Sequence, residues 1–475
     1  MKIKEEKTQI VSYLEDASNF TSGRADKIYI PEDEKEVIDI IRTCAKEKTP
    51  LTISAAGTGT VAGRIPLEGV VLSTEKLDKI IKIDTKNKTA TLQAGVVVDN
   101  FLKEIEKLNL FYPPFPTERT AFIGGNVATN ASGEYSFRFG STREYVKRIR
   151  MVLSTGDVLD ISRKEFFEKN GFIDYKFFKI KLPSYRTPNV KCSAGYYIKD
   201  NMDAIDLLIG SEGTLGVITE VEVYLIDKLP ERFIVILFFK KDTNIPVIVK
   251  KIKSKKEELG IYSLEFFDEN SLNFLKDEYD FVVENSCALY IEAEKENLEK
   301  LVDIIEEFKV ISSAVAESLS DYKKLVEFRH KLPEKINSYF KKIGCSKIAV
   351  DAAVPDIKFE EFFWYYKKLI SEKTTFKTVL FGHIGESHLH FNMFPETTQQ
   401  KELAQEIYVE VIKKAVSLGG TGFAEHGIGK LKNKYLKYMY TQDQILEMAK
   451  IKKTFDPYWI LSLDNIFPKN IIEHL

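Results

Sequence analysis

The sequence of 475 residues is poor in histidine and cysteine, and it carries no excess of either charge. Its 69 Lys and Arg residues are offset by 71 Asp and Glu residues, and the resulting net charge of −2 argues against a nucleic-acid partner. The 4 cysteines stand far apart, so none has the spacing of a zinc knuckle or an iron–sulfur cluster. Thiols of this kind are typical of a reducing cytoplasm; they are Cys44, Cys192, Cys287 and Cys345.

The sequence also lacks a long hydrophobic run. The longest, Phe233–Phe239, has the length of a buried strand and is too short for a membrane helix. No apolar stretch follows the charged N-terminal residues, so we expect no signal peptide. The protein is expected in the cytoplasm, either free or peripheral at a membrane. Neither internal repeats nor low-complexity linkers are found.

Length and hydrophobic pattern predict a mixed α and β protein of two or three domains. A shift towards more Lys and Glu at 228–230 marks the start of a second domain. We expect helices over 1–50, 294–308 and 441–454, and strands over 51–54, 69–73, 89–95, 220–225, 233–239, 376–381 and 389–394.

Three segments consist almost entirely of small residues. They are 55–63, 124–133 and 210–216. The second of them follows the proline-rich segment 113–117. Glycine allows the backbone to approach a ligand closely, and the unblocked N–H groups of 56–63 suit a pyrophosphate. The 56–63 loop does not match the dinucleotide fingerprint with its helix and following acid, so we do not expect a Rossmann domain here.

The few histidines are concentrated near the C-terminal end. Four of the 6 lie within the segments 382–392 and 425–429. Imidazoles gathered beside a carboxylate suit a divalent ion such as zinc, manganese or iron. A single histidine is more often a hydrogen-bonded core residue, whereas this cluster predicts a metal or an active site.

The first of these segments predicts a strand pair with a turn at 385–387. Because strand side chains alternate, His388, His390 and Asn392 on the return strand share one face. His383, just before the turn, can reach the same volume. We favour His383 and His390 as metal ligands and regard His388 as spare.

The second segment places Glu425 and His426 side by side in a glycine-rich loop. Glu425 can complete a two-histidine, one-carboxylate site with open positions. His426 can then act as a general base, because imidazole titrates near neutral pH. The alternative is a helix-capping glutamate beside a surface histidine.

Two cations are candidates for binding a carboxylate. Arg329 offers a guanidinium that can bind a carboxylate through two hydrogen bonds. Lys347 is a second candidate for the same role. On the residues alone, a solvated helix face is the commoner role for such an arginine.

Taken in order, these segments resemble the FAD-linked oxidases of the vanillyl-alcohol-oxidase superfamily. The branch most similar contains D-lactate dehydrogenase, D-2-hydroxyglutarate dehydrogenase and the flavin subunit of glycolate oxidase. The resemblance spans 25–470. It is carried by Pro-x-x-Pro-Thr, Ile-Gly-Gly-Asn-Val-Ala-Thr-Asn-Ala and Arg-aromatic-Gly in 113–140, by Gly-Ser-Glu-Gly-Thr-Leu-Gly in 210–216, and by Gly-His-x-Gly…His-x-Asn and Glu-His-Gly-Ile-Gly in 382–392 and 425–429.

The resemblance implies an α+β fold in three parts. Residues 1–226 form a two-part FAD-binding domain of the p-cresol methylhydroxylase (PCMH) type. Residues 227–412 form a substrate or cap domain with an antiparallel sheet. Residues 413–475 complete the active site and return to pack on the FAD domain.

The resemblance also assigns roles to residues. His383, His390 and Glu425 match the metal ligands, Asn392 lies near the substrate, His426 is the base, Arg329 binds the substrate carboxylate, and Lys347 is a looser match. The FAD residues are Ala56, Gly57, Thr58, Gly59 and Thr60 at the pyrophosphate, Pro116, Thr117, Gly124, Gly125, Asn126, Ala128, Thr129, Asn130, Gly133 and Gly140 at the flavin and ribityl chain, and Glu212, Gly213, Gly216, Val217 and Ile218 at the adenine half.

The implied function is metal-assisted oxidation of a D-2-hydroxyacid, such as D-lactate or glycolate, to the 2-oxoacid by hydride transfer to flavin N5. The alternatives are a metal-dependent hydrolase without flavin and a flavin subunit of a multi-protein electron-transfer complex. A flavoprotein of the same fold with non-redox ether-lipid chemistry would carry consecutive histidines, which this sequence lacks.

The first histidine in the chain is His330, so loops of the FAD domain cannot form a histidyl–flavin bond, and we expect non-covalent FAD. Attachment through Cys192 has no support in the sequence. The electron acceptor is left open between electron-transferring flavoprotein, an iron–sulfur subunit, a quinone and oxygen. The substrate, the metal and the oligomeric state, a homodimer included, are also left open.

Two departures from the family pattern stand out. Glu386, Ser387 and His388 replace the usual Asp-Gly-Asn, which adds an imidazole and a longer acid next to the metal ligands. Pro333 stands where some relatives have a hydroxyl residue, which argues against a dicarboxylate such as 2-hydroxyglutarate.

Overall fold

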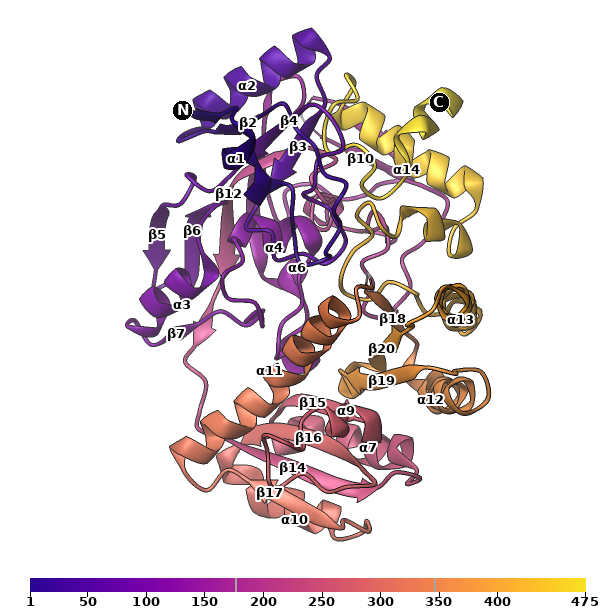
Figure 1. The fold of residues 1–475 in the computed structure, drawn as a ribbon. Helices are drawn as coiled ribbons and strands as arrows, with labels where there is room; N and C mark the ends of the chain where they lie inside the picture. Colours follow the sequence, from indigo (N-terminus) through magenta and orange to yellow (C-terminus); the bar gives the residue numbers. More distant parts are fainter. Residues whose placement is uncertain (176, 346) are drawn as a thin grey trace.

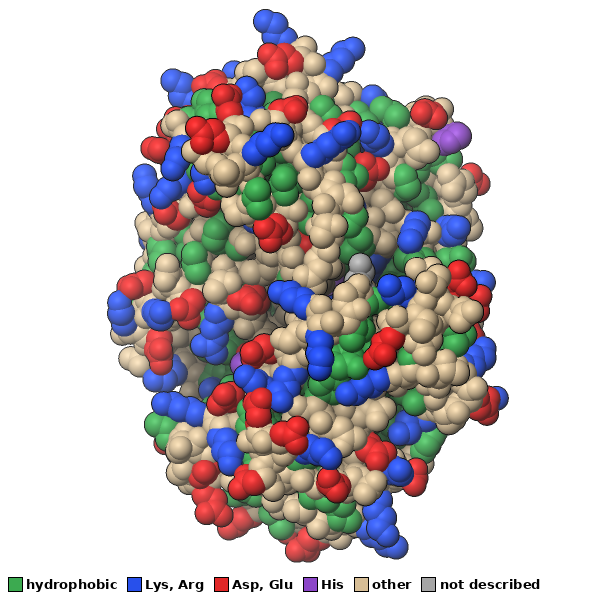
Figure 2. All heavy atoms as spheres, viewed as in Figure 1, with side chains coloured by type: hydrophobic (Ala, Val, Ile, Leu, Met, Phe, Trp, Pro, Cys, Tyr) green, Lys and Arg blue, Asp and Glu red, His purple; other side chains and the backbone are tan. Residues whose placement is uncertain are grey.

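The computed structural model describes residues 1–175, 177–345 and 347–475. Elements from the two ends of the chain lie together in one part of the molecule, and the middle of the chain forms a second part built around a large sheet (Figure 1). Basic and acidic side chains are interspersed over the face seen in Figure 2, in keeping with the balanced charge. None of the helices in the described ranges has the length and hydrophobicity needed to cross a bilayer.

The first sheet has four strands in the order β1 (Lys2–Lys4), β2 (Lys27–Ile30), β4 (Val70–Ser73) and β3 (Leu51–Ser54). β2, β4 and β3 are parallel, and β1 is antiparallel to β2. Helix α2 (Glu34–Glu47) is capped by Asp33, whose side chain accepts from the Glu36 N–H. It packs Val37, Ile40, Ile41 and Cys44 against the sheet.

The prediction of a helix over 1–50 is therefore largely wrong. Besides α2, this region contains β1, the short helix α1 (Lys7–Ile10) and β2. In β2, Ile28 and Ile30 are buried and alternate with partly exposed neighbours, which is a strand pattern. The predicted strands 51–54, 69–73 and 89–95 correspond to β3, β4 and β6.

The second sheet is antiparallel, in the order β5 (Ile80–Asp84), β6 (Thr89–Gln93), β12 (Val217–Tyr224), β8 (Val146–Val152) and β9 (Val158–Ser162). Helices α3 (Val98–Glu106) and α4 (Ile123–Thr129) share its core. The glycine-rich segment 124–133 thus begins as a helix. A Cβ on Gly124 would lie 2.6 Å from the Ala94 Cβ, so glycine is required for the close approach of α4.

The third sheet has seven antiparallel strands, as predicted for the cap. Their order is β17 (Ser312–Val315), β14 (Arg232–Lys240), β16 (Ser286–Glu294), β15 (Ile261–Phe267), β19 (Lys377–Gly382), β20 (His388–Phe394) and β18 (Ile348–Ala353). Helices cover both faces, which explains why β14 is apolar from Phe233 to Phe239. Ile234, Ile236 and Phe238 face α11 (Leu319–Lys342), while Val235, Leu237 and Phe239 share a core with α7 (Ile245–Ser254), α12 (Asp356–Glu372) and α13 (Thr398–Ser417).

Shorter elements connect these layers. They are β7 (Leu110–Phe111), α5 (Ser136–Phe139), α6 (Thr142–Tyr145), β10 (Phe172–Asp174), β11 (Lys179–Lys181), β13 (Ile226–Asp227), α8 (Lys256–Leu259), α9 (Glu269–Asn273) and α10 (Leu298–Ile305). The domain boundaries stay predictions: 226/227 lies within β13, and 412/413 lies within α13.

The C-terminal segment returns to the first sheet. Helix α14 (Gln442–Phe455) is followed by an extended stretch that pairs with β3, where the Leu51 N–H donates to Ile460 O and the Ser462 N–H donates to Leu51 O, both at 2.8 Å. The buried ammonium of Lys452 stabilises this return. It donates to Asp456 Oδ2 at 2.8 Å, to Leu461 O at 2.7 Å and to Thr214 O at 3.0 Å.

We expect Lys452→Met to lower the free energy of unfolding by about 3–5 kcal/mol, because it leaves the Asp456 carboxylate buried without its cation. The measurement is a urea denaturation followed by circular dichroism. The matched control is Lys453→Met on the exposed side of the same helix, where only a carbonyl contact is lost. Equal denaturation midpoints for the two variants would contradict the stabilising role.

Candidate active site

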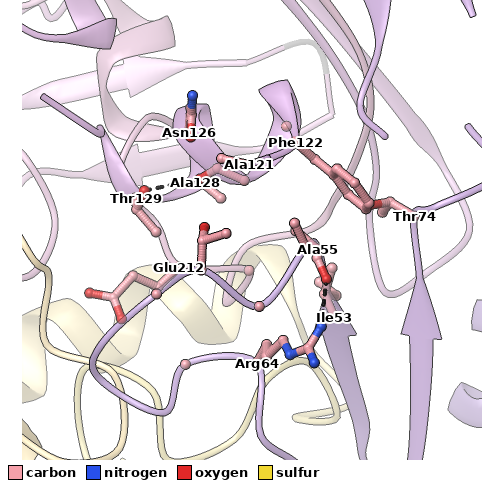
Figure 3. Close-up of a pocket in the computed structure, with 18 of the residues that line it drawn as sticks. Ile53, Ala55, Arg64, Thr74, Ala121, Phe122, Asn126, Ala128, Thr129 and Glu212 are labelled. Atoms are coloured by element: carbon pink, nitrogen blue, oxygen red, sulfur yellow. Dashed lines mark hydrogen bonds between the residues drawn. The ribbon is translucent and has the colours of Figure 1, made fainter. Parts of the chain in front are cut away.

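Two adjoining cavities contain the residues singled out in the sequence. The first, which we call the cleft, lies between the 55–64 loop, α4 and the 211–218 segment, and has a volume of about 150 Å³ (Figure 3). The second, which we call the histidine cavity, has a volume of about 310 Å³. They share Thr58, Gly59, Ala121, Asn126, Thr129 and His426.

The cleft is lined mainly by the small residues that the sequence indicated. A Cβ built on Gly59 meets no atom within 4 Å, so this glycine faces open space. Across the cleft, α4 contributes Asn126 and Thr129, and Glu212 lies on the neighbouring 211–218 segment (Figure 3). Of the predicted FAD residues, those lining one or both cavities are Ala56, Gly57, Thr58, Gly59, Thr60, Pro116, Thr117, Gly124, Gly125, Asn126, Ala128, Thr129, Glu212, Gly213, Gly216 and Ile218.

Four predicted FAD residues do not line either cavity. Asn130 ends α4 in the left-handed region, and its side chain accepts from the Arg143 N–H. A Cβ on Gly133 would lie 1.8 Å from Pro114 O, so this glycine permits tight backbone packing. Gly140 has a φ of +81°, and Val217 is fully buried in a core. Their contacts are structural, and their role towards FAD stays a prediction.

The sequence analysis missed several residues of the cleft wall. Arg64 donates to Ala55 O at 2.9 Å and so brings a guanidinium to the loop (Figure 3). Asn465, from the C-terminal return, donates to Gly63 O and Glu212 O, both at 2.9 Å. No local pattern marks Asn465, because only the tertiary fold brings it to the cleft.

The histidine cavity brings together every predicted catalytic and metal residue. It is lined by Arg329 of α11, Lys347 before β18, Gly382 and His383 at the end of β19, and His390 and Asn392 of β20, together with Glu425 and His426. The predicted strand alternation is confirmed, since Leu389, Phe391 and Met393 lie in the apolar core. His388 lies beside the cavity and is fully buried.

Four side chains are close enough to hold one metal ion. His383, His388, His390 and Glu425 each offer a ligand atom, and these atoms lie within 4.8 Å of one another. Glu425 Oε2 is 3.3 Å from His383 Nε2 and 3.8 Å from His390 Nε2. Three imidazoles and a carboxylate are donors that suit zinc or iron.

A buried lysine orients the carboxylate of this group. Lys191 Nζ lies 3.5 Å from Glu425 Oε1 and 3.1 Å from Glu386 Oε2. Burial opposes the charged form of Glu425, but Lys191 and His383 outweigh it and hold the pKa of this carboxyl well below its usual range. One oxygen of Glu425 thus faces the ammonium and the other faces the histidines.

Glu265 of β15, which the sequence analysis missed, holds two of the predicted residues. Its Oε1 lies 2.8 Å from Arg329 Nη2 and 3.0 Å from His383 Nδ1. Burial disfavours the His383 imidazolium, but Glu265 and Glu425 overcome this and raise the pKa of His383 to about 9. An acid inside the apolar strand Ile261–Phe267 was the available signal, since buried charges are rarely without a partner.

Asp351 of β18 is the second missed acid, and it is fully buried. Its Oδ1 lies 2.7 Å from His388 Nε2, and its Oδ2 lies 3.0 Å from His426 Nδ1. Oδ2 also accepts the backbone N–H groups of Glu425 and His426. Burial would raise the pKa of Asp351, yet the charges of His426 and Lys432 and the hydrogen bonds of the His388 and His426 side chains hold it well below its usual range.

The loop that carries Glu425 and His426 is held from its other end by Glu212. Glu212 Oε1 accepts the Ile428 N–H at 2.8 Å, and Oε2 accepts the Gly429 N–H at 2.6 Å. The carboxylate of Glu212 is therefore engaged by this loop, although the residue lines the cleft.

The structure contradicts two alternatives considered in the sequence analysis. Glu425 does not cap a helix. The Arg329 side chain is only 10% exposed, so it does not lie on a solvated helix face.

Two further polar groups of the site have few partners. Lys347 donates to Asn337 Oδ1 at 3.3 Å, and burial together with Lys432 lowers its pKa to about 8. The Oδ1 atom of Asn392 is buried and accepts no hydrogen bond from the described residues. Such groups are the ones that a polar ligand would satisfy.

The three residues at 386–388, which depart from the family pattern, make different contacts. Glu386 pairs with Lys191 and accepts from Ser136 Oγ at 2.5 Å. Ser387 adopts a left-handed conformation with a φ of +54°, and its hydroxyl donates to Asp356. Only the third residue, His388, joins the group of candidate metal ligands.

Comparison with known proteins agrees with this arrangement. Residues 25–162 match the family "FAD binding domain", and residues 234–465 match "FAD linked oxidases, C-terminal domain". D-lactate dehydrogenase of Anaerostipes hadrus is 30% identical over 464 residues, covering 90% of this chain and 86% of that protein. Glycolate oxidase subunit GlcD of Bacillus subtilis is 27% identical, covering 96% and 92%.

Two solved structures share the fold. The 4-ethylphenol oxidase from Gulosibacter chungangensis has a TM-score of 0.72 at 13% identity, covering 99% of this chain and 95% of that one. p-Cresol methylhydroxylase has a TM-score of 0.71 at 14% identity, covering 98% and 94%. The matches to the two FAD family models set aside the hydrolase without flavin. The chain belongs to the FAD-linked oxidases, in the branch of the D-lactate, glycolate and D-2-hydroxyglutarate dehydrogenases, and is an FAD-dependent oxidoreductase.

Proposed function

We propose that this protein is a dehydrogenase that oxidises a small D-2-hydroxyacid, such as D-lactate or glycolate, to the 2-oxoacid with non-covalent FAD and a divalent metal ion. The observation that carries the proposal is the convergence of the predicted metal and catalytic residues on the histidine cavity, which adjoins the cleft at His426. A cavity of about 310 Å³ that also contains Phe267, Pro333 and Phe381 suits a short substrate.

Arg329 is the residue proposed to bind the substrate carboxylate. One arm of its guanidinium is fixed by Glu265, and its Nε has no hydrogen-bond partner among the described residues. A guanidinium held in this way offers further N–H donors in a planar fork that matches a carboxylate. Asn392 and Lys347 line the same cavity and are proposed to orient the rest of the substrate.

His426 is proposed as the base that removes the proton of the substrate hydroxyl. The Asp351 carboxylate lies 3.0 Å from His426 Nδ1, which favours the tautomer with a proton on this nitrogen. Nε2 is then the free proton acceptor, and the side chain is 29% exposed towards the shared part of the two cavities. The same carboxylate stabilises the imidazolium that forms.

The two cofactors would supply the remaining chemistry. When bound, the metal ion polarises the substrate hydroxyl and FAD accepts the hydride. His383, His390 and Glu425 are proposed to hold the ion, and the open space beside Gly59 suits a cofactor that approaches the backbone. Cys192 lies outside the cleft with its Sγ 3.6 Å from Thr421 Oγ1, which supports non-covalent FAD. Reoxidation is proposed to require an electron-acceptor protein or a quinone.

The test of the function is anaerobic absorbance between about 350 and 550 nm, where flavins absorb, before and after addition of D- and L-2-hydroxyacids. We expect one short D-acid to bleach the flavin band. A flavin band that none of the acids bleaches would overturn the proposed substrate class. Bleaching by the L-acid alone would overturn the stereochemistry.

His426→Asn is expected to retain FAD but to reduce it about 10²–10⁴-fold more slowly, because general-base catalysis is worth that factor. Asparagine keeps an N–H that can donate to Asp351 and lacks Nε2. Stopped-flow flavin reduction measures the rate. His474→Asn, at the exposed end of the chain, is the control. Near-normal reduction in His426→Asn would remove His426 as the base.

Gly59→Val is expected to weaken FAD binding without unfolding the protein. The φ of Gly59 lies outside the left-handed region, and the new side chain would project into the open cleft. Overpacking of this kind costs about 1–3 kcal/mol, which corresponds to a rise of about 5- to 150-fold in the dissociation constant. Fluorescence titration of the apoprotein with FAD measures the dissociation constant. Gly59→Ala is the control and should give a smaller rise, because its side chain is smaller. An unchanged dissociation constant in Gly59→Val would place FAD elsewhere.

A further inference from the structure

His388 is the fully buried histidine of the site, and one of its ring nitrogens has no partner among the described residues. It lies on β20 with 0% of its side chain exposed, and its ring centre is 5.3 Å from that of His383 and 4.7 Å from that of His390. Its Nε2 is 2.7 Å from Asp351 Oδ1. Its Nδ1 is buried and has no hydrogen-bond partner among the residues that the structure describes.

The contact with Asp351 determines the tautomer of the His388 ring. A carboxylate at 2.7 Å accepts the proton on Nε2, so Nδ1 carries the lone pair. A buried acceptor without a donor is destabilised, because it has lost its hydrogen bonds to water and gained none in the protein. A neutral imidazole nitrogen in this state is also a metal ligand, and a carboxylate bound to the opposite nitrogen is the usual support of such a ligand.

We propose that His388 is a fourth protein ligand, so that this chain binds its ion through three imidazoles and the Glu425 carboxylate. The inference deepens the proposed function and rests on it. The ligand atoms of the four residues already lie within 4.8 Å of one another, a span that an ion with bonds of about 2.1 Å can draw together. Asp351 then supports His388 as Glu265 supports His383.

The additional imidazole sets the class of metal. Imidazole favours zinc, iron, nickel and copper, whereas carboxylate, carbonyl and water ligands favour magnesium, calcium and manganese. A site with three nitrogens and one oxygen from the protein therefore selects zinc or iron over manganese. It also leaves fewer coordination positions for the substrate than a site with two imidazoles and one carboxylate.

A second group, made of Asp351, His390 and His426, could compete for the ion. It is the poorer site because the Asp351 oxygens are already engaged. Oδ1 bonds to His388, and Oδ2 accepts the backbone N–H groups of Glu425 and His426. An ion there would break contacts that hold the loop in place.

The test uses His388→Gln in the full-length FAD-containing protein. The glutamine amide can still donate to Asp351 but has no equivalent of Nδ1. After treatment with a chelator, zinc and manganese binding are measured separately by equilibrium dialysis and elemental analysis. We expect the zinc dissociation constant to rise at least about tenfold, since loss of a supporting group alone costs 10–100-fold. The manganese dissociation constant should change less, so the ratio of the manganese to the zinc dissociation constant should fall.

A second readout counts the ligands. Pulsed electron paramagnetic resonance of the copper(II)-loaded protein should detect one imidazole fewer in His388→Gln than in the unmodified protein. His474→Gln is the matched control for metal content, and retained FAD shows that each variant is folded. Equal zinc affinity and equal imidazole counts for His388→Gln and the unmodified protein would overturn the inference.

Other outcomes separate this inference from the proposed function. Loss of zinc in His426→Gln but not in His388→Gln would assign the ion to the Asp351 group and overturn the inference. An unmodified protein that binds neither ion would overturn it as well. Flavin bleaching by a D-2-hydroxyacid is measured independently, so either result leaves the test of the oxidation itself unaffected.

Discussion

The site depends on two buried carboxylates that hold one loop from opposite ends. Asp351, on the seven-stranded sheet, accepts the N–H groups of Glu425 and His426. Glu212, from the 211–218 segment of the cleft wall, accepts those of Ile428 and Gly429. Charged acceptors make strong hydrogen bonds to backbone donors in a buried setting. The loop therefore fixes the position of the cleft relative to the histidine cavity, and His426 lies where they meet.

The same region concentrates buried charge. Glu265, Asp351 and Glu425 face Arg329, Lys432 and Lys191, and these side chains are at most 14% exposed. Buried ion pairs contribute little net stability, because desolvation offsets much of their attraction. Their role here is positional. Glu265 contacts Nδ1 of His383, and Asp351 contacts Nε2 of His388 and Nδ1 of His426, so each of these acids fixes the orientation of the rings that it contacts.

Much of the site was predictable from the sequence, because strand alternation places His388, His390 and Asn392 on one face and glycine-rich segments mark the cleft. The supporting residues were not. Glu265, Asp351 and Lys191 lie far from the histidines in sequence and reach them only through sheet pairing and loop packing. The N-terminal region was mispredicted as helical because β1 and β2 are short, and they are stabilised by pairing in a sheet with β4 and β3 rather than by a local pattern. Asn465 was missed because it reaches the cleft only through the return of the C-terminal segment.

The return of the C-terminal segment has a consequence for synthesis on the ribosome. Leu51 pairs with Leu461, and Asn465 donates to Gly63, 402 positions earlier, and to Glu212, 253 positions earlier. These contacts join the cleft wall to residues that are translated much later. The N-terminal part of the chain thus leaves the ribosome with an incomplete cleft wall and with the edge of β3 unpaired. The wall of the cleft is therefore complete only when residues 460–465 have been synthesised and have folded back onto β3.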